Sequence, residues 1–328
     1  MNKLKELTFP AIANMKSRID ALEKKLAIKK PPFYDQNKMF TYYLDREFSI
    51  EQKKWFIEKQ SIRALGYFPN LDDPKSFNEK THWYKLNYQD PLITKCIDKF
   101  TFKEHLASAV GHEYVVPLLG VWDNSRNIDF DTLPAKFVLK SNWGSGSRHV
   151  LIVKDKSTLN IDQTKLRLNS WIQPWENVYY HTFDWGYKDI PPKIIAEKLI
   201  DNKKKEYKFF CFDGNPVYFY VANDSTPGAR NTHDYFDMNW NHLPFVRHSQ
   251  RSASPVERPG NFDEMVSLCI ALSKPFPHVR VDICDTEAGL LVEELTFYTG
   301  SGTGRFNPRE WDYKFGEAFN LPSPRLIE

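Results

Sequence analysis

Two short runs near the end of the sequence alternate between apolar and polar residues, and this period of two restricts the segment to paired β-strands. The runs cover residues 279–284 and 290–296, and the turn-forming stretch between them predicts a hairpin. The polar positions that share a face are Arg280 and Asp282 on the first run, and Glu294 and Thr296 on the second. The hairpin is therefore expected to gather one guanidinium and two carboxylates on one surface.

Oxygen ligands in this arrangement suit Mg²⁺, which takes one or two carboxylates completed by phosphate and water. The sequence thus predicts a magnesium site at Asp282, Glu294 and Thr296. A second interpretation remains open, in which Arg280 forms an ion pair with Asp282 or Glu294 and the charges only decorate the hairpin.

The composition is that of a globular chain with balanced charge. Its 328 residues are 41% hydrophobic, enough for one large core or two moderate ones. The 45 basic and 42 acidic residues leave a net charge of +3, which argues against a nucleic-acid partner. Four scattered cysteines favour a reducing, cytoplasmic setting. We see no signal-peptide core and no membrane-length apolar run, so any work at the inner face of a membrane is expected to be peripheral.

Residues 1–95 are predicted to be helical. Apolar residues recur at steps of three and four within 12–30, which indicates a helix with a narrow apolar seam: Ile12, Met15, Ile19, Leu22 and Leu26. Two heptads are too few to predict a coiled coil, so docking onto the protein's own body and pairing with a second copy both remain open. Two capping boxes begin further helices, Ser49 with Gln52 and Ser76 with Glu79. The first of these helices is expected to end near Gly66, and another helix is expected over 98–109.

Strand and helix signals alternate over residues 96–328, which predicts an α+β domain with its boundary near residue 95. Strands are expected at 114–121, 137–140, 149–153, 193–199, 207–212 and 217–221, before the hairpin, with helices at about 162–171 and 261–274. Asp213-Gly214 lies between two aromatic runs and predicts a tight hairpin turn.

A lysine at a strand end, Lys140, precedes a loop of small residues. The loop consists of Gly144, Ser145, Gly146 and Ser147. Backbone amides in such a loop can surround phosphate oxygens, and the lysine would reach them as a point charge. Its spacing matches neither a Walker A loop nor a Rossmann fingerprint, so a plain hairpin loop remains an alternative. His149, just after the loop, is better interpreted as a satisfied strand-end histidine than as a phosphate contact.

The strand over 193–199 becomes charged at its end, a transition that suits an adenine site. The predicted nucleotide contacts there are the backbone groups of Lys198 and Leu199 and the side chains of Glu197 and Asp201. The alternative is a strand that leaves the core for a lysine-rich turn at 203–205. Lys208 alternates with aromatic residues and would add positive charge over the phosphates.

Taken in order, these segments resemble a known family. The matching set is Asp98-Lys99, 137–140 with 144–146, 197–199, 207–214, 237–240, 280–282 and 294–297. Together they look like the ATP-grasp superfamily, and within it the TupA-like branch associated with teichuronopeptide and capsular polysaccharide biosynthesis. The resemblance covers roughly residues 75–320.

The resemblance implies an ATP-grasp fold in which two α+β subdomains clamp ATP and Mg²⁺. The helical region predicted over residues 1–95 would precede it. By position the resemblance implies Lys99 and Lys140 as phosphate lysines, 197–199 as the adenine hinge, Asp201 as a ribose contact, and Asp282 with Glu294 as magnesium ligands. It implies that Arg280 steadies the transferring phosphoryl group, so positioning and charge do the work without a protein nucleophile. Two features depart from the family pattern: Thr296 stands where many members have asparagine, and no N-terminal α/β subdomain is evident.

The expected function is an ATP-dependent carboxylate–amine ligase that acts through an acyl phosphate. The expected partners are an amine and a small-molecule, nucleotide-sugar or polysaccharide acceptor such as a uronic acid. Two alternatives remain open: a phosphotransferase on the same fold, and a non-catalytic scaffold of a capsule assembly complex. A homo-oligomer formed through the N-terminal helix is also open.

Overall fold

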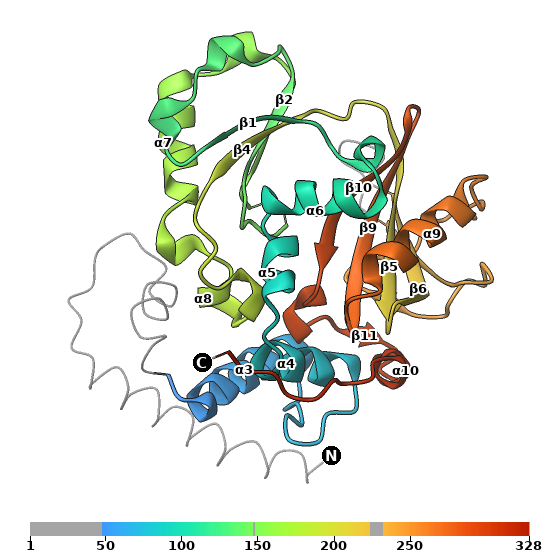
Figure 1. Cartoon of the computed structure of the whole chain (residues 1–328). Helices are drawn as coiled ribbons and strands as arrows, with labels where there is room; N and C mark the ends of the chain where they lie inside the picture. Colours follow the sequence, from blue (N-terminus) through green and yellow to red (C-terminus); the bar gives the residue numbers. More distant parts are fainter. Residues whose placement is uncertain (1–47, 147, 224–231, 328) are drawn as a thin grey trace.

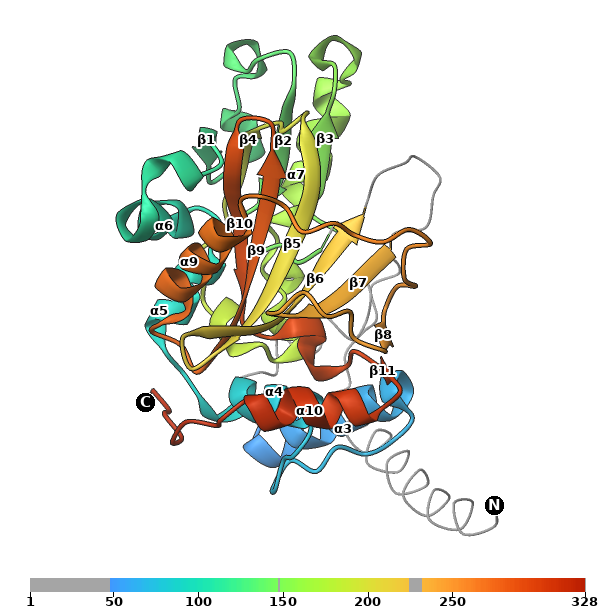
Figure 2. The same ribbon diagram turned by 90° about the vertical axis from the view of Figure 1, so that its right-hand side faces the viewer.

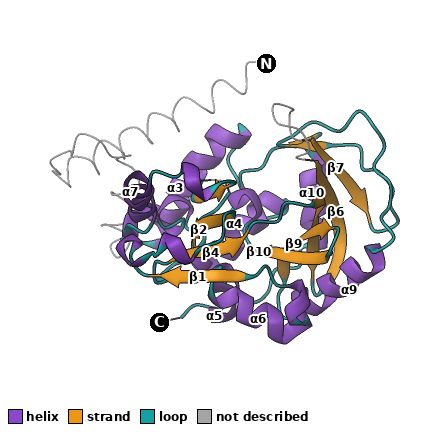
Figure 3. Cartoon of the chain, turned by 90° about the horizontal axis from the view of Figure 1, so that it is seen from above, coloured by secondary structure: helices purple, strands orange, loops and turns teal. Residues whose placement is uncertain are grey.

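The computed structural model describes residues 48–146, 148–223 and 232–327, so the apolar seam predicted over 12–30 lies outside them. In these residues a four-stranded and a five-stranded sheet form two α+β halves, and a group of helices lies at the base (Figure 1). Seen from above, the strands of the smaller sheet lie alongside the β10–β9 side of the larger one (Figure 3).

Helices α3 (Ile50–Leu65) and α4 (Phe77–Asn87) begin where the capping boxes predict. The Ser49 and Ser76 hydroxyls each accept a hydrogen bond from the N3 amide, and the N3 side chain accepts one back from the cap amide. Helix α3 ends at Gly66, whose left-handed φ of 83° favours glycine.

Two helices occupy the segment in which one was predicted. Helix α5 (Pro91–Ile97) was missed, although Asp90 caps it and proline stands at its first turn. Helix α6 (Thr101–Val110) then ends at Gly111. Helices α4 and α5 pack into the same core as the larger sheet, and the proposed boundary near residue 95 remains a prediction.

The smaller sheet has the order β1-β4-β2-β3, and every pairing is antiparallel. Its strands are β1 (Leu118–Trp122), β2 (Phe137–Ser141), β3 (Val150–Val153) and β4 (Ile194–Lys198). Helix α7 (Ile161–Trp171) covers the face that carries Phe137 and Leu139. Lys140 and Glu197 belong to the opposite face because side chains alternate along a strand. The first strand starts four residues later than predicted, since His112–Tyr114 form a 3-10 turn.

The larger sheet has the order β10-β9-β5-β6-β7. Its strands are β5 (Lys203–Phe212), β6 (Asn215–Asn223), β7 (Thr232–Asp237), β9 (His278–Thr286) and β10 (Gly289–Thr296). Asp213 and Gly214, both at positive φ, form the predicted tight turn between β5 and β6. The alternative interpretation placed a lysine-rich turn at 203–205, but this run starts β5 and pairs with β9.

Helices cover both faces of the larger sheet. Helix α9 (Phe262–Ser273) packs on one face, where the Phe262 ring lies 5.8 Å from Phe209. On the other face, Phe210 packs against Phe77 of α4 and Phe315 of α10 (Glu310–Ala318). Figure 2 shows α4 and α10 below the sheet. Their packing fills only one end of that face, which leaves the other end for polar residues.

The remaining elements are short. Helix α8 (Tyr179–Thr182) lies near α3, and β8 (Val246–Arg247) pairs with β11 (Phe306–Asn307). A 3-10 segment, η8 (Thr299–Gly302), follows β10 and contacts α4. Within the described part of the chain, no helix has the length and apolar character needed to cross a bilayer.

Candidate active site

One residue from each strand of the larger sheet contributes to a row across a single face. Glu294 of β10 pairs with Asp282 of β9, and Asp282 pairs with Lys208 of β5. Lys208 pairs with Tyr220 of β6, which pairs with Tyr235 of β7. Directly paired residues of an antiparallel sheet project to the same side. The register therefore brings two carboxylates, an ammonium and two phenols onto one surface.

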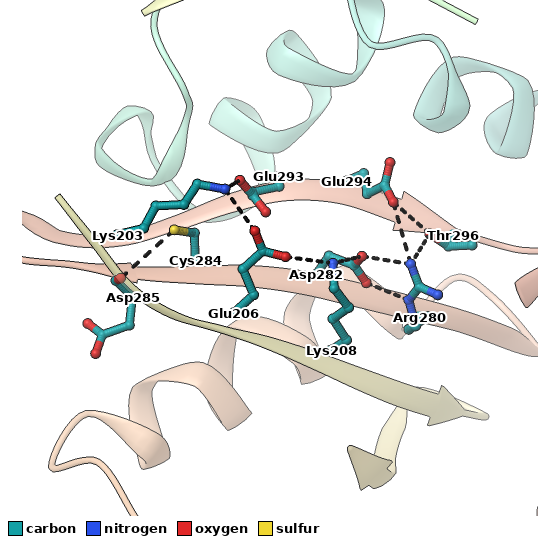
Figure 4. A network of polar contacts seen from close by, with 10 residues as sticks. All are labelled: Lys203, Glu206, Lys208, Arg280, Asp282, Cys284, Asp285, Glu293, Glu294 and Thr296. Atoms are coloured by element: carbon teal, nitrogen blue, oxygen red, sulfur yellow. Dashed lines mark hydrogen bonds and ion pairs between the residues drawn. The ribbon is translucent and has the colours of Figure 1, made fainter. Parts of the chain in front are cut away.

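Asp282 is fully buried and is held by two cations (Figure 4). Nε and Nη2 of Arg280 donate to its two carboxylate oxygens at 2.6 and 2.7 Å, and Nζ of Lys208 donates at 2.7 Å. Burial alone would lower the pKa of Lys208, but the charge of Asp282 raises it well above its ordinary value. The ion pair that the second interpretation of the hairpin expected between Arg280 and Asp282 is present.

Glu294 presents an ionised carboxylate at the edge of this network. Its side chain is 38% exposed, and its Oε1 lies 3.4 Å from Nη2 of Arg280 and 3.3 Å from Oγ1 of Thr296. Burial would raise the pKa of Glu294, but the charges of Lys99, Arg280 and Lys208 lower it to about 2. These cations come from separate elements, so Glu294 is the point on which they converge.

A β-bulge after Val292 adds a second glutamate to the same side of the strand. Val292 and Leu295 are buried, while Glu293 and Glu294 between them are both partly exposed. Our sequence reasoning missed Glu293. The signal was a spacing of three, rather than two, between successive buried positions of this strand.

The bulged glutamate belongs to an outer extension of the network, which Figure 4 also shows. Lys203 donates to Glu293 at 2.7 Å and to Glu206 at 2.8 Å, and Glu206 lies 3.1 Å from Lys208. Glu206 was also missed, because it lies between the lysine-rich turn of the alternative interpretation, 203–205, and the strand expected from residue 207.

Lys99 connects the small-residue loop to the carboxylates. It follows α5, where its amide donates to the Asn142 carbonyl at 3.0 Å and its ammonium donates to the Gly144 carbonyl at 2.6 Å. Burial lowers the pKa of Lys99, and the charge of Glu294 opposes that shift. The structure therefore brings Lys99 to the small-residue loop and places its charge near that of Glu294.

The small-residue loop depends on its two glycines for different reasons. A Cβ on Gly144 would lie 2.8 Å from Cβ of His149 and 2.9 Å from Oγ of Ser141, whereas Gly146 has open space and a φ of 63°. His149 is buried, and its ring nitrogens lie 3.0 Å from Ser141 Oγ and 3.4 Å from a Glu176 oxygen. It is the satisfied histidine that the sequence favoured.

The small-residue loop contains two serines, Ser145 and Ser147. Ser145 is exposed and lies near Tyr187, a partly buried phenol whose pKa is raised by burial and by the charge of Glu294. Ser147 lies outside the described residues.

Glu197 holds two lysines on the inner face of the smaller sheet. Its oxygens lie 2.6 Å from Nζ of Lys103 and 2.7 Å from Nζ of Lys140. Burial would raise the pKa of Glu197, but these two charges lower it. Burial would likewise lower the pKa of Lys140, and Glu197 raises it. Lys103, on α6, was not predicted. The Glu197 carboxylate, which the sequence analysis assigned to an adenine or ribose contact, is therefore paired with lysines in the structure.

The other residues predicted at the adenine hinge are Lys198, Leu199 and Asp201, and each has different hydrogen-bond partners. The amide of Lys198 donates to the Pro117 carbonyl at 3.0 Å. Asp201 pairs with Lys136 at 2.9 Å, and both side chains are more than half exposed. The structure does not bring Asp201 into the lysine and carboxylate cluster. Leu199 follows the last residue of β4, and its backbone makes no backbone hydrogen bond within residues 48–146, 148–223 and 232–327.

The donors present fit a magnesium ion bridged to phosphate. The described residues contain no group of three or more His, Cys, Asp or Glu side chains arranged for a metal, but Mg²⁺ needs only one or two protein carboxylates beside phosphate oxygens. Glu294 supplies an ionised, accessible carboxylate. Asp282, its neighbour in register, would complete the pair once Arg280 and Lys208, which donate to its oxygens, turn toward phosphate. Thr296 adds a hydroxyl next to Glu294.

Comparison with known proteins identifies the family. The model of the TupA-like ATP-grasp family matches residues 79–320. No curated protein matches this sequence significantly.

Solved structures with a similar fold are distant in sequence. A D-alanine–D-alanine ligase from Bacillus anthracis, complexed with ATP, is 18% identical over 62% of this chain and 53% of that protein, with a TM-score of 0.38. An N5-carboxyaminoimidazole synthetase from Staphylococcus aureus with ADP is 17% identical over 61% and 43%, with a TM-score of 0.34. The ATP-grasp ligase PsnB with its minimal precursor, Mg and ADP is 13% identical over 70% and 61%, with a TM-score of 0.38. The chain thus spans about half the length of the first two of these proteins.

Proposed function

We propose, from the premise that this chain belongs to the TupA-like ATP-grasp family and has the ATP-grasp fold, that it is an ATP-dependent carboxylate–amine ligase. The reaction would first join a carboxylate oxygen of the acceptor to the γ-phosphorus of ATP, with ADP as leaving group. An amine would then attack the acyl carbon, lose a proton and displace inorganic phosphate. The product is an amide.

The observation that supports this proposal is the convergence of charges from both sheets on Glu294. Lys99 and Lys140 approach from the side of the smaller sheet, and Arg280 and Lys208 lie on the larger one; all four lower the pKa of Glu294. A triphosphate and the transferring phosphoryl group need this distribution of positive charge, because preorganised charge carries most of such catalysis.

Each group has a role that its position supports. Lys99 and Lys140 would bind the phosphates, with the amides of the loop at Gly144–Gly146, and the free backbone of Leu199 would pair with adenine. Arg280 would stabilise the phosphoryl group during transfer. Asp282 and Glu294 would hold Mg²⁺, which when bound neutralises phosphate charge.

Lys140 must exchange partners for this to occur, since Glu197 holds it in the structure. A phosphate would compete with Glu197 for that ammonium, and Lys103 would keep Glu197 neutralised afterwards. The two-lysine arrangement therefore lets one lysine leave without stranding a buried carboxylate.

We extend the proposal to the substrates through the family. The acceptor would be a sugar acid of a cell-surface polysaccharide precursor, and the second substrate an amino acid or small amine. Both assignments rest on the family resemblance, whereas the proposed cytoplasmic location rests on the four scattered cysteines.

The test is ADP release measured with ATP, Mg²⁺, a panel of uronic acids or their nucleotide derivatives, and a panel of amines. A ligase releases ADP and phosphate only when acid and amine are both present, and mass spectrometry should find the amide. A stable phosphate ester formed with one acceptor alone would establish a phosphotransferase instead. ATP binding without turnover on any pair would favour the scaffold.

A further inference from the structure

Arg247 of β8 is a buried guanidinium that no carboxylate neutralises within the part of the chain that the structure describes. It is 2% exposed and takes part in no ion pair there. Its Nη2 donates to the Thr299 carbonyl at 3.2 Å, its Nε has no hydrogen-bond partner among the same residues, and it lies 4.8 Å from the Phe306 ring centroid. Burying a charge without an ion-pair partner lowers the stability of the folded protein, and binding of a counter-charge would offset this loss.

The charge of Asp312 raises the pKa of Arg247, but both oxygens of this carboxylate already accept hydrogen bonds from other residues. One of its oxygens accepts from the Asn78 amide at 3.0 Å, and the other accepts from the Asn78 side chain and from the Tyr67 hydroxyl, both at 2.9 Å. Its role is therefore to fix the start of α4. The counter-charge for Arg247 has to come from elsewhere.

Arg247 lies near the proposed active site, because it donates to the carbonyl of Thr299, three residues after Thr296, to which Arg280 donates at 3.0 Å. Burial raises the pKa of the Tyr220 phenol, and the charges of Arg280 and Arg247 both oppose that shift. The next residue, His248, is exposed. A Cβ on Gly300 would lie 3.0 Å from Nη2 of Arg247 and 3.4 Å from Nε2 of His248. Partial burial and the charge of Arg247 lower the pKa of His248 to about 4, so its ring is neutral at neutral pH and would bind an anion through a ring N–H. Both side chains thus approach the backbone of Gly300.

We propose that Arg247 and His248 bind a second anionic group of the acceptor, separate from the carboxylate that is activated at Arg280. This inference rests on the proposed function and specifies its substrate class: an acid with two anionic groups. One is the reacting carboxylate, and the other is a carboxylate or phosphate that anchors the molecule.

If Arg247 has only a structural role, its substitution should change ligand affinity by the same factor whatever the charge of the ligand. In that case the guanidinium only holds the Thr299 carbonyl and packs on Phe306, and its loss would weaken all ligands alike. An anchoring role predicts that the second charge of the ligand matters, and that it matters through Arg247 and His248.

The test is calorimetric binding to the full chain in the presence of a non-hydrolysable ATP analogue. The probes are D-glucuronate, with one carboxylate, D-glucarate, with two, and D-glucuronate 1-phosphate. We expect at least one dianionic probe to bind about tenfold or more tightly than D-glucuronate, the size of one charge-assisted hydrogen bond. Whether D-glucarate or the sugar phosphate shows the gain identifies the anchoring group.

Two variants and one control test which side chains cause the preference for dianionic probes. Arg247→Gln and His248→Asn should each abolish most of it while affinity for the ATP analogue stays the same; asparagine tolerates the left-handed φ of 65° at position 248. Arg305 also donates to a backbone carbonyl, that of Leu65 at 3.0 Å, from the neighbouring segment. Arg305→Gln should keep the preference.

Equal binding of one- and two-charge probes to the wild-type chain would overturn the proposal, and so would a preference that survives in the variants. If Arg247→Gln does not fold, the wild-type comparison and His248→Asn still decide. A chain that prefers dianions but releases no ADP with any acid and amine would refute the ligase and leave the anion site in place.

Discussion

Lys208 of β5 lies directly opposite Asp282 of β9, and its ammonium donates a 2.7 Å hydrogen bond to a carboxylate that is fully buried. Arg280 donates to the same carboxylate with two nitrogens. Each of the two cations also has a second carboxylate nearby, since Glu206 lies 3.1 Å from Lys208 and Glu294 lies 3.4 Å from Arg280. Asp282 is therefore the carboxylate that joins both cations at the centre of a larger ion-pair network.

The relationship predicts an order of stability for substitutions of its members. Asp282→Asn leaves two cations without their shared counter-charge, so it should lower the free energy of unfolding by about 3–5 kcal/mol. Lys208→Met leaves Asp282 paired with Arg280 and should cost about 1–3 kcal/mol. Urea unfolding of both variants measures the difference. A larger loss for Lys208→Met would contradict the assignment of Asp282 as the central charge.

Local sequence patterns predicted much of this architecture. The alternation around Arg280 and Asp282 fixed the hairpin face because a period of two can place those side chains only on one side. The serine caps of α3 and α4 and the Asp213-Gly214 turn were equally local, and all were confirmed. Each depends on residues within a few positions of one another.

Contacts between distant segments could not be predicted in the same way. The pairing of Glu197 with Lys103 and Lys140 joins three elements, and nothing in the spacing of those residues encodes it. Arg247 was missed because it lies on a two-residue strand with no pattern of its own. Glu293 did have a local signal, in the bulge spacing, which shows that the limit there was one of interpretation.

Lys140 and Glu294 should both be essential for turnover if they act on the same triphosphate. Lys140→Ala and Glu294→Ala should each reduce the rate of ADP release by about a hundredfold or more, the usual effect of losing one preorganised charge partner. Lys165→Ala on α7, the helix behind the smaller sheet, is the matched control and should keep its rate. Near-normal turnover in the first two variants would refute the assigned site.

The low pKa of Glu294 predicts a dependence of stability on acid. Burial would raise this pKa from its ordinary value of 4.5, but Lys99 and Arg280 lower it to about 2. A carboxyl with a lower pKa in the folded state adds stability above its unfolded pKa, and this contribution is lost as the pH falls toward the folded value. The stability difference between wild type and Glu294→Gln should therefore shrink between about pH 6 and about pH 3. Urea titrations at both values measure it, and a constant difference would show that Glu294 keeps an ordinary pKa.

The two glycines of the phosphate loop should respond differently to alanine. Gly144→Ala places a methyl group 2.8 Å from Cβ of His149, so the buried histidine and the loop must shift. We expect it to weaken ATP binding by about tenfold or more, since small displacements of positioning groups are costly. Gly146→Ala meets open space and only a positive φ, which costs about 1 kcal/mol of stability. Equal effects on ATP affinity, measured by calorimetry, would contradict the distinction.

Phe77 is the residue through which α4 supports the polar face from below. It is fully buried, and its ring packs edge to face against Phe210 of the sheet and Phe315 of α10, with centroids 5.9 Å away in both cases. Phe77→Ala should lower the free energy of unfolding by about 3–5 kcal/mol, because neighbouring aromatic rings cannot collapse into the cavity. Phe68→Ala, at a site that is 39% exposed, is the control and should cost about 1 kcal/mol or less. Similar losses in the two variants, measured by urea unfolding, would mean that α4 contributes little to holding the sheet in place.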